Sequence, residues 1–270
     1  MPADDVWTFA SGVRLHASSI RMQIRTRLQR ANSSRNLWEP DEEPFWRAAL
    51  QTASALPQCA SRGGTPLRHG DACTLLDMGA AYGYYSLLAR QHGPPGLAVH
   101  AFNPHPLFMR ELQRNLALNG RDGEVHLHEL AIGGSEGAAE MDYAVGGGLN
   151  GSKHGHEHGR NTRRTVRVAT LDEWAATVAP ALLKRPPPFL FVKLDIEGAA
   201  AAALAGGRRL LRHATHVLVG IHNDDEWAAA REAFAEPAYE IVMAQKGRNG
   251  ATGNGVFAAR KRIGSDGRRV

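Results

Sequence analysis

Three apolar segments of the chain end in side chains that can carry or accept a proton. Asp77 closes the first of these segments, Asp195 follows another, and His222 follows a third. Carboxylates and imidazoles serve as general acids and bases, and imidazole titrates near neutral pH. Asp195, Glu197 two residues later and His222 are therefore the candidate catalytic residues. Two alternatives stay open: Glu197 as an acid that only begins a helix, and His222 as a histidine that only bonds a loop.

The turn after Asp77 has glycines at positions 79 and 83. Glycines at such a turn let a ligand lie against the backbone, and an acid at the strand end can pair with a cationic group. A dinucleotide fingerprint needs a glycine where Ala81 stands, and no acid occupies position 103, so a nicotinamide oxidoreductase is disfavoured. A tight packing turn without a ligand stays open as the alternative.

Four segments, in the same order along the chain, resemble motifs of FkbM-type S-adenosylmethionine-dependent methyltransferases. Residues 77–86 resemble D-x-G-A-x-x-G-Y-Y-S, 101–106 resemble A-F-E-P-x-P, 170–173 resemble T-L-D-E, and 192–198 resemble K-I-D-V-E-G. The resemblance covers roughly residues 39–260. It implies a class I, Rossmann-like fold and transfer of a methyl group from S-adenosylmethionine, to a hydroxyl of a small molecule such as a sugar or a secondary metabolite.

The resemblance also implies where the cofactor lies. The methionine part would be held at the glycine turn, the ribose at the end of the second strand, and the adenine after the third strand. The cofactor-binding residues implied are Asp77, Gly79, Ala80, Tyr82, Gly83, Asn103, Glu129, Ala131 and Asp195. For a hydroxyl acceptor, a base must take a proton, and Asp195 or His222 would do so.

Two positions depart from the family pattern. Asn103 stands where the family has Glu, so a ribose hydroxyl would lose a charge-assisted hydrogen bond. Gly220 stands where the family often has the Glu of an E-x-H segment ending in His222. A catalytically degenerate cofactor-binding protein of the same fold is therefore the alternative to an active enzyme.

Histidines and cysteines offer little evidence for a metal. The alternating histidines of residues 153–159 could ligate zinc or nickel, but the loop is glycine-rich and no second ligand set is evident. A loop on the acceptor side or a solvated loop is favoured, no metal ligand is predicted, and a need for a divalent ion stays undecided. Cys59 and Cys73 lack metal-site spacing and are interpreted as two ordinary thiols.

Composition excludes several classes of protein. With 43% apolar and 22% charged residues, the 270-residue chain is typical of a globular protein, and no apolar run is long enough for a membrane span. The net charge of +5 comes from basic ends, which leave residues 39–259 with a net charge of −3. Specific nucleic-acid binding is therefore disfavoured, and an RNA methyltransferase is a weaker alternative. Without a signal peptide the cytoplasm is expected, with an organelle as the alternative because residues 12–38 contain arginine and no acid.

Alternating strands and helices are expected to position the candidate residues. Buried-type strands followed by helices predict a doubly wound, mostly parallel sheet, whose ligands bind beyond the carboxyl ends of the strands. We expect an N-terminal extension over 1–38 with a helix near Ile20–Leu28, the catalytic domain over 39–260, and a basic tail over 261–270. The predicted strands cover 73–77, 97–102, 125–132, 189–194, 216–221, 239–244 and 256–259. The predicted helices begin near 39 and cover 84–91, 106–119, 199–212 and 226–235, with a loop over 57–71 and a hairpin within 133–169.

Overall fold

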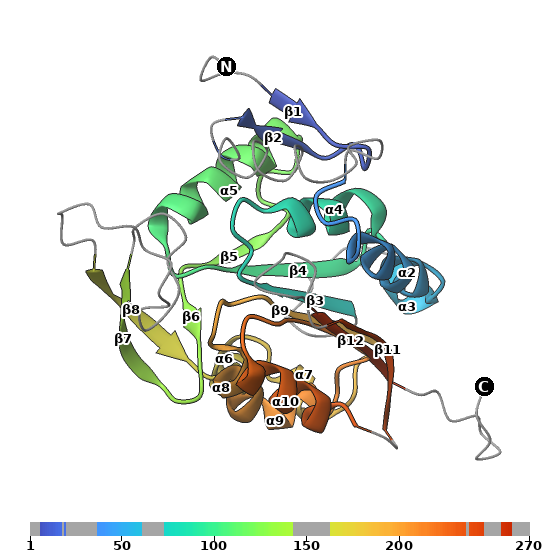
Figure 1. Ribbon diagram of the computed structural model, residues 1–270. Coiled ribbons are helices and arrows are strands. Elements are labelled where there is room, and N and C mark those ends of the chain that lie inside the picture. Colours follow the sequence, from blue (N-terminus) through green and yellow to red (C-terminus); the bar gives the residue numbers. More distant parts are fainter. Residues whose placement is uncertain are drawn as a thin grey trace.

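A seven-stranded sheet forms the centre of the molecule (Figure 1). The computed structural model describes residues 6–17, 19, 37–60, 73–142, 163–235, 238–245 and 255–260. The strand order is β11 (Tyr239–Gln245), β12 (Gly255–Arg260), β10 (His216–Gly220), β9 (Phe189–Leu194), β3 (Cys73–Met78), β4 (Leu97–Phe102) and β5 (His126–His128). Strand β12 runs antiparallel to both of its neighbours, and the other pairs are parallel. The predicted doubly wound, mostly parallel sheet is confirmed.

Helices cover both faces of this sheet (Figure 1). One face carries α2 (Glu43–Ser54), α4 (Tyr84–His92) and α5 (Pro106–Leu118). The other carries α6 (Leu171–Val178), α7 (Ala181–Lys184), α8 (Ala200–Gly206), α9 (Arg208–Leu211) and α10 (Asp224–Ala233). Every residue of β3 and β9 is buried, because a strand covered on both faces can expose neither side. In the part of the chain that the structure describes, no helix combines the length and apolar character needed to cross a bilayer.

Alternation along the central strands decides which side chains meet the helices. Leu75 of β3 packs in the core under α2 and α4, whereas Leu76 and Met78 pack in the opposite core. Successive side chains of a strand point to opposite faces, so Asp77 shares the α2 and α4 side with Leu75. The same argument places Lys193 of β9 on that side, two residues after Phe191.

The predicted third strand over 125–132 is wrong, because the chain divides it between two sheets. Strand β5 ends at His128, whose carbonyl accepts hydrogen bonds from the backbone N–H groups of Asn103 and Leu130. The chain then enters a three-stranded sheet of order β6 (Ala131–Ile132), β8 (Arg163–Ala169) and β7 (Gly137–Asp142). The antiparallel pair of β7 and β8 confirms the predicted hairpin.

Three other sequence predictions change. Within the expected helical extension, the described residues form a hairpin of β1 (Val6–Thr8) and β2 (Arg14–His16), while the helix expected near Ile20–Leu28 lies outside the described residues. The expected loop over 57–71 begins with a short helix, α3 (Pro57–Ala60). The single helix expected over 199–212 breaks at Gly207, where a Cβ would lie 2.8 Å from the side chain of Leu171. The domain boundaries at 38/39 and 260/261 stay predictions.

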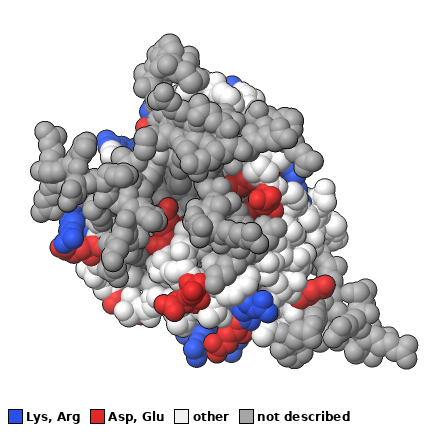
Figure 2. All heavy atoms as spheres, in the orientation of Figure 1, with Lys and Arg blue, Asp and Glu red and all other residues white. Residues whose placement is uncertain are grey.

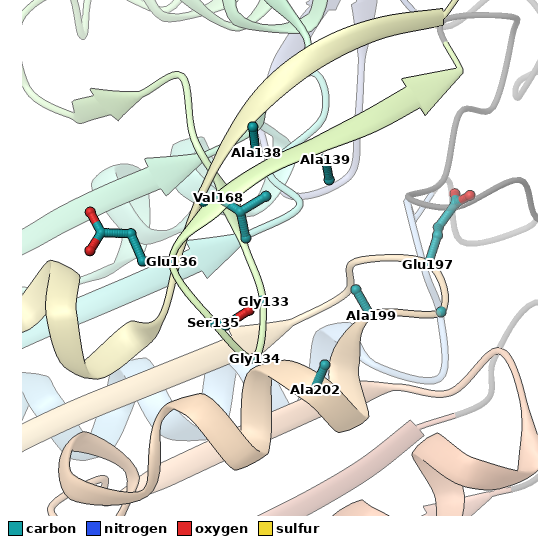
Figure 3. Close-up of a pocket in the computed structure, with 12 residues that line it drawn as sticks. Gly133, Gly134, Ser135, Glu136, Ala138, Ala139, Val168, Glu197, Ala199 and Ala202 are labelled. Carbon is teal, nitrogen blue, oxygen red and sulfur yellow. The ribbon is translucent and has the colours of Figure 1, made fainter.

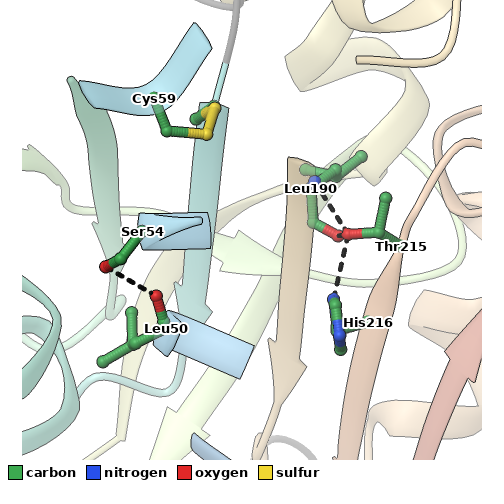
Figure 4. The surroundings of a disulfide bond; sticks show 7 residues. Leu50, Ser54, Cys59, Leu190, Thr215 and His216 are labelled. Carbon is green, nitrogen blue, oxygen red and sulfur yellow. Dashed lines mark hydrogen bonds between the residues drawn. A yellow bond between two sulfur atoms is a disulfide. The ribbon is translucent and has the colours of Figure 1, made fainter. Parts of the chain in front are cut away.

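Cys59 and Cys73 form a disulfide, so their interpretation as two ordinary thiols is wrong (Figure 4). The bond joins α3 to the first residue of β3, with the Cα atoms 5.5 Å apart. Both cysteines are buried in the core under α2 and α4. Disulfides persist mainly in oxidising compartments, so this bond counts against the cytoplasmic expectation.

The disulfide should stabilise the fold by restricting the unfolded chain. Its 14-residue sequence separation predicts that the double substitution Cys59→Ser, Cys73→Ser lowers the free energy of unfolding by about 3 kcal/mol. Urea unfolding followed by circular dichroism measures this loss, and reducing the wild-type protein with dithiothreitol should reproduce it. Equal stability of the oxidised and reduced proteins would contradict the prediction.

Candidate active site

The glycine turn between β3 and α4 lies against the end of β9. Gly79, Ala81 and Gly83 all have positive φ angles, of 78°, 45° and 87°. A Cβ at Gly79 would lie 1.9 Å from the backbone carbonyl oxygen of Asp195, so no other residue fits there. The turn and Asp195 therefore form one continuous backbone surface at the carboxyl edge of the sheet.

Ala81 occupies a conformation that favours glycine. An L-residue with positive φ costs about 1 kcal/mol relative to the right-handed region. The position at which a dinucleotide fingerprint needs a glycine thus keeps a positive φ angle although its residue is alanine. The backbone N–H groups of Gly79 and Ala80 both donate to the carbonyl of Phe102, with N···O distances of 3.0 Å. These hydrogen bonds connect the turn to the end of β4.

Asp77 lies behind the turn and has no exposed surface. Its Oδ2 accepts a 2.7 Å hydrogen bond from the Ser86 hydroxyl, and its Oδ1 lies 3.7 Å from the ammonium group of Lys193. Burial raises the pKa of Asp77, while the positive charge of Lys193 opposes that shift. The structure thus brings Asp77 to the predicted edge but encloses its carboxylate beneath the turn.

Asp195 is the partly exposed carboxylate of this group. Its side chain is 30% exposed, its Oδ2 accepts a 3.1 Å hydrogen bond from Lys193, and its Oδ1 lies 3.3 Å from Nε2 of His222. Although burial acts in the opposite direction, these two cations hold the pKa of Asp195 well below its ordinary value. The carboxylate is therefore ionised at neutral pH.

His222 lies between two carboxylates. Its Nε2 faces Asp195 and its Nδ1 lies 3.3 Å from Oε2 of the buried Glu226, which also accepts a hydrogen bond from the backbone N–H of His222. Burial lowers the pKa of His222, but hydrogen bonds to both carboxylates outweigh it and raise the pKa to about 10. At neutral pH the ring is therefore an imidazolium, which must lose a proton before it can act as a base.

The departure at Gly220 has a steric explanation. A Cβ at this position would lie 2.6 Å from Oδ1 of Asp195, so the carboxylate of Asp195 occupies the space that a larger residue would need. Position 220 thus has no side chain where the carboxylate of Asp195 packs against the strand. It does not remove carboxylates from this edge.

The other predicted cofactor residues lie around the turn with different exposures. Asn103 is buried, and its Oδ1 accepts a hydrogen bond from the backbone N–H of His105. Glu129 is exposed, Tyr82 is half-buried, and Ala131 is buried in the small core of the second sheet. Because that core encloses the side chain of Ala131, only its backbone is available to a ligand.

Glu197 lies on the rim of a hollow of about 440 Å³, beside the end of β9 (Figure 3). Its φ is 39°, a left-handed conformation that is uncommon for a glutamate. Glu136, in the turn between β6 and β7, lies at the opposite end of the hollow (Figure 3). The other lining residues are Gly133, Gly134, Ser135, Gly137, Ala138, Ala139, Val168, Gly198, Ala199 and Ala202.

The sequence analysis did not single out Glu39, Glu42 or Tyr85, which also lie at this edge. Glu39 and Glu42 precede α2, for which the sequence predicts only that a helix begins near 39. The hydroxyl of Tyr85 donates to Glu39 over 2.7 Å and lies 3.4 Å from Glu42. No local signal could have found these groups, because Glu42 and Asp195 are far apart in sequence.

The T-L-D-E segment has a structural role. Thr170 and Glu173 form a reciprocal capping box at the start of α6, and Asp172 accepts hydrogen bonds from the N–H groups of Arg209 and Leu210.

Among the described residues no cluster of three or more His, Cys, Asp or Glu could hold a metal ion, and the histidine loop 153–159 lies outside them.

A matched pair of glycine substitutions tests the close approach of the turn to Asp195. Gly79→Ala should destabilise the fold by about 4 kcal/mol or more, since the new methyl group overlaps a backbone atom. Gly120→Ala, at another positive φ but with no atom within 4 Å, should lose only about 1 kcal/mol. Chemical denaturation measures both, and equal losses would contradict the predicted clash.

His222 should make stability depend on alkaline pH. The folded-state pKa of about 10 lies above the ordinary 6.5, so its stabilisation is complete below pH 6.5 and is lost as pH rises through about 10. We expect the Tm of the wild type to fall between pH 7 and pH 10, and to fall less for His222→Gln. Differential scanning fluorimetry measures this, and an equal fall in both proteins would exclude the paired imidazolium.

The profile of the Methyltransferase FkbM domain matches residues 77–241. A search of curated protein sequences finds no match. The matched range exceeds half of the chain and includes Asp77, Asp195 and His222.

Solved structures similar to the chain include other methyltransferases. Methyltransferase FkbM from Methylobacillus flagellatus KT is 14% identical, with 81% of this chain and 58% of that chain covered and a TM-score of 0.46. An O-methyltransferase from Bacillus cereus in complex with SAH is 12% identical, with 90% and 91% covered and a TM-score of 0.46. The O-methyltransferase TomG from Streptomyces achromogenes, in complex with SAM, is 15% identical, with 80% and 79% covered and a TM-score of 0.43. The matched profile shows that this chain belongs to the FkbM methyltransferase family, whose members are S-adenosylmethionine-dependent enzymes.

Proposed function

We propose that the protein transfers a methyl group from S-adenosylmethionine to a hydroxyl oxygen of a small molecule, with Asp195 facing the acceptor. The observation that carries this proposal is the carboxylate of Asp195, ionised and partly exposed beside the glycine turn, two residues before Glu197 on the rim of the hollow. A carboxylate in this place can align a hydroxyl group and accept its hydrogen bond.

The residues present fit a sulfonium nucleoside. Gly79 and Gly83 have no side chain, so a ligand can lie against the backbone of the turn. Oδ1 of Asp77 is buried, accepts no hydrogen bond from the described residues and lies 3.7 Å from the ammonium group of Lys193. Lys193 is shared with the carboxylate of Asp195, so its single positive charge does not balance both carboxylates. A cationic ligand above the turn would compensate the remaining negative charge.

The cofactor supplies an activated methyl group, so the protein has to align the acceptor and remove a proton. Asp195 would orient the hydroxyl, and Lys193 and His222 would hold the carboxylate in place. The pKa of Asp195 is held low, which makes it a weak proton acceptor, whereas the deprotonated form of His222 would be a stronger one. Glu197 would border the acceptor at the rim of the hollow. The backbone around Gly79, Ala80, Tyr82 and Gly83 would hold the methionine part, and Asn103, Glu129 and Ala131 the nucleoside.

A small neutral acceptor is favoured over RNA. The residues that line the hollow beside Glu197 include the acidic Glu136 and Glu197 and no lysine or arginine, so a phosphate group would meet negative charge. On the face shown in Figure 2, acidic and basic side chains of the described residues are interspersed without a continuous basic patch. Phosphate recognition depends on such basic contacts.

Transfer can be measured with radiolabelled S-adenosylmethionine and a panel of hydroxylated acceptors, sugars first. We expect label in the acceptor and S-adenosylhomocysteine as product, and a loss of about 100-fold or more in turnover for Asp195→Asn. Asp122→Asn, an exposed acid between α5 and β5, serves as the control with unchanged turnover. Tight binding of S-adenosylhomocysteine without turnover of any acceptor would support the degenerate cofactor-binding protein instead.

Asn103 offers a test of the ribose position. A carboxylate there would accept charge-assisted hydrogen bonds, so Asn103→Glu should tighten S-adenosylmethionine binding by about 1 kcal/mol, roughly fivefold in Kd. Asn103→Asp should do the same while keeping the acceptor for the backbone N–H of His105. Titration calorimetry measures both, with Asn119→Asp, which contacts Arg14, as the control. Unchanged or weaker binding by both variants would remove the ribose assignment.

A further inference from the structure

Four adjacent strands present a row of residues at the carboxyl edge, on the side covered by α2 and α4. Asp77 is in register with Lys193 across β3 and β9, and Gly220 is in register with Gly255 across β10 and β12. Their orientation follows from alternation, because the residues two positions away in each strand lie in the core under α2 and α4. Those residues are Leu75, Phe191, Leu218 and Phe257. Lys193 is in register with Leu218 of β10, so the glycine pair lies two residues beyond the charged pair along the sheet. The charged pair and the glycine pair therefore form a staggered row.

Two carboxyl groups from elsewhere in the chain lie over the bare glycine pair. A Cβ at Gly220 would lie 2.6 Å from Oδ1 of Asp195, and a Cβ at Gly255 would lie 3.6 Å from Oε1 of Glu42. The Cβ positions of residues opposite each other in an antiparallel pair are about 4.5–5.5 Å apart. Glu42, which precedes the range matched by the family profile, therefore lies at the same part of the sheet edge as Asp195, close enough for the two charges to interact.

The surroundings of Glu42 contain more negative than positive groups. Glu42 is 6% exposed and faces Glu39 and Tyr85, whose hydroxyl donates its shorter hydrogen bond to Glu39. From β9, Lys193 lies 5.3 Å from the centre of the Tyr85 ring and is already paired with Asp77 and Asp195. His222 bonds Asp195 from its far side, and the neighbours from β11 and β12 are the uncharged Met243 and Gly255.

This arrangement makes Glu42 the carboxyl group of the edge that most readily keeps its proton. Burial raises the pKa of Glu42 well above the ordinary value, the charges of Glu39 and Asp195 raise it further, and Lys193 opposes them. Asp195 shifts in the other direction because Lys193 and His222 pair with it. The pKa values of Glu42 and Asp195 therefore shift in opposite directions, because different groups surround the two carboxyl groups.

We propose that Glu42 is a further residue of the cofactor site, which holds a proton while the site is empty and releases it to solvent when the sulfonium cation enters. The inference rests on the proposed function, since it assumes that the cofactor lies above the glycine turn. The positive charge of the sulfonium takes over the compensation that the proton supplied, and no covalent bond changes. S-adenosylhomocysteine carries a neutral thioether, so it leaves the proton on Glu42, and the site favours the substrate form of the cofactor over the product form.

Titration calorimetry in two buffers of different ionisation enthalpy counts the protons released on binding. At pH 6.5 we expect net proton release when S-adenosylmethionine binds the wild type, and release at most half as large with S-adenosylhomocysteine. Glu42→Gln should lose the release with S-adenosylmethionine. Glu43→Gln is the matched control, because Glu43 is the adjacent residue, is 1% exposed and pairs with Arg47 and Tyr84 away from the row; it should keep the release.

The affinity itself gives a second readout. Between pH 5.5 and 7.0, below the titration of a free α-amino group at about 7.7–8.0, proton release makes the wild-type affinity for S-adenosylmethionine rise with pH, by at most about tenfold per pH unit. Glu42→Gln should bind with a flatter dependence, and Glu42→Asp should restore part of the slope. A residue that only supports folding would change the Tm but not this slope.

The possible results distinguish a failure of the Glu42 proposal from a failure of the proposed function. Equal proton release with both ligands, or release that survives in Glu42→Gln, overturns the role of Glu42 and leaves the proposed function intact. If Glu42→Gln does not fold, the comparison of the two ligands on the wild type still decides. A wild-type protein that binds neither ligand overturns the proposed function and this inference with it.

Discussion

The buried ammonium group of Lys193 is the charge on which the candidate site depends. It lies between Asp77, under the glycine turn, and Asp195, at the open edge, and it is 2% exposed. Its own pKa is raised, because the surrounding carboxylates outweigh the burial that would lower it. Removing one member of a buried charged group leaves the others uncompensated, which is strongly destabilising. The turn and Asp195 are therefore linked through one lysine.

The order of the strands explains why these charges can meet. Strands β3 and β9 are neighbours in the sheet although about 110 residues separate them along the chain. The backbone N–H of Asp195 donates to the carbonyl of Met78, and Gly79 has no side chain to prevent that approach. Close packing of backbone at this point fixes the distance between the glycine turn and Asp195.

The second half of the site is anchored by hydrogen bonds to helix ends. Glu226 accepts from the backbone N–H groups of Ala200 and His222, and Asn223 caps α10. His222 is held between Glu226 and Asp195, so one connected set of polar contacts joins the start of α8, the start of α10 and the end of β9. A substitution at Glu226 would therefore disturb Asp195 without contacting it.

The sequence by itself determined the alternation of strands and helices, and thereby the edge at which Asp77, Asp195 and His222 gather. Apolar runs and glycine turns are local signals, so β3, β4, β9 and the helices that follow them were predictable. The division of residues 125–132 between two sheets and the pairing of Cys59 with Cys73 were not, because each depends on partners distant in the chain. Tertiary structure alone decided that His222 is clamped between carboxylates and that Glu42 lies over Gly255, since burial and electrostatic coupling arise only after the strands have packed.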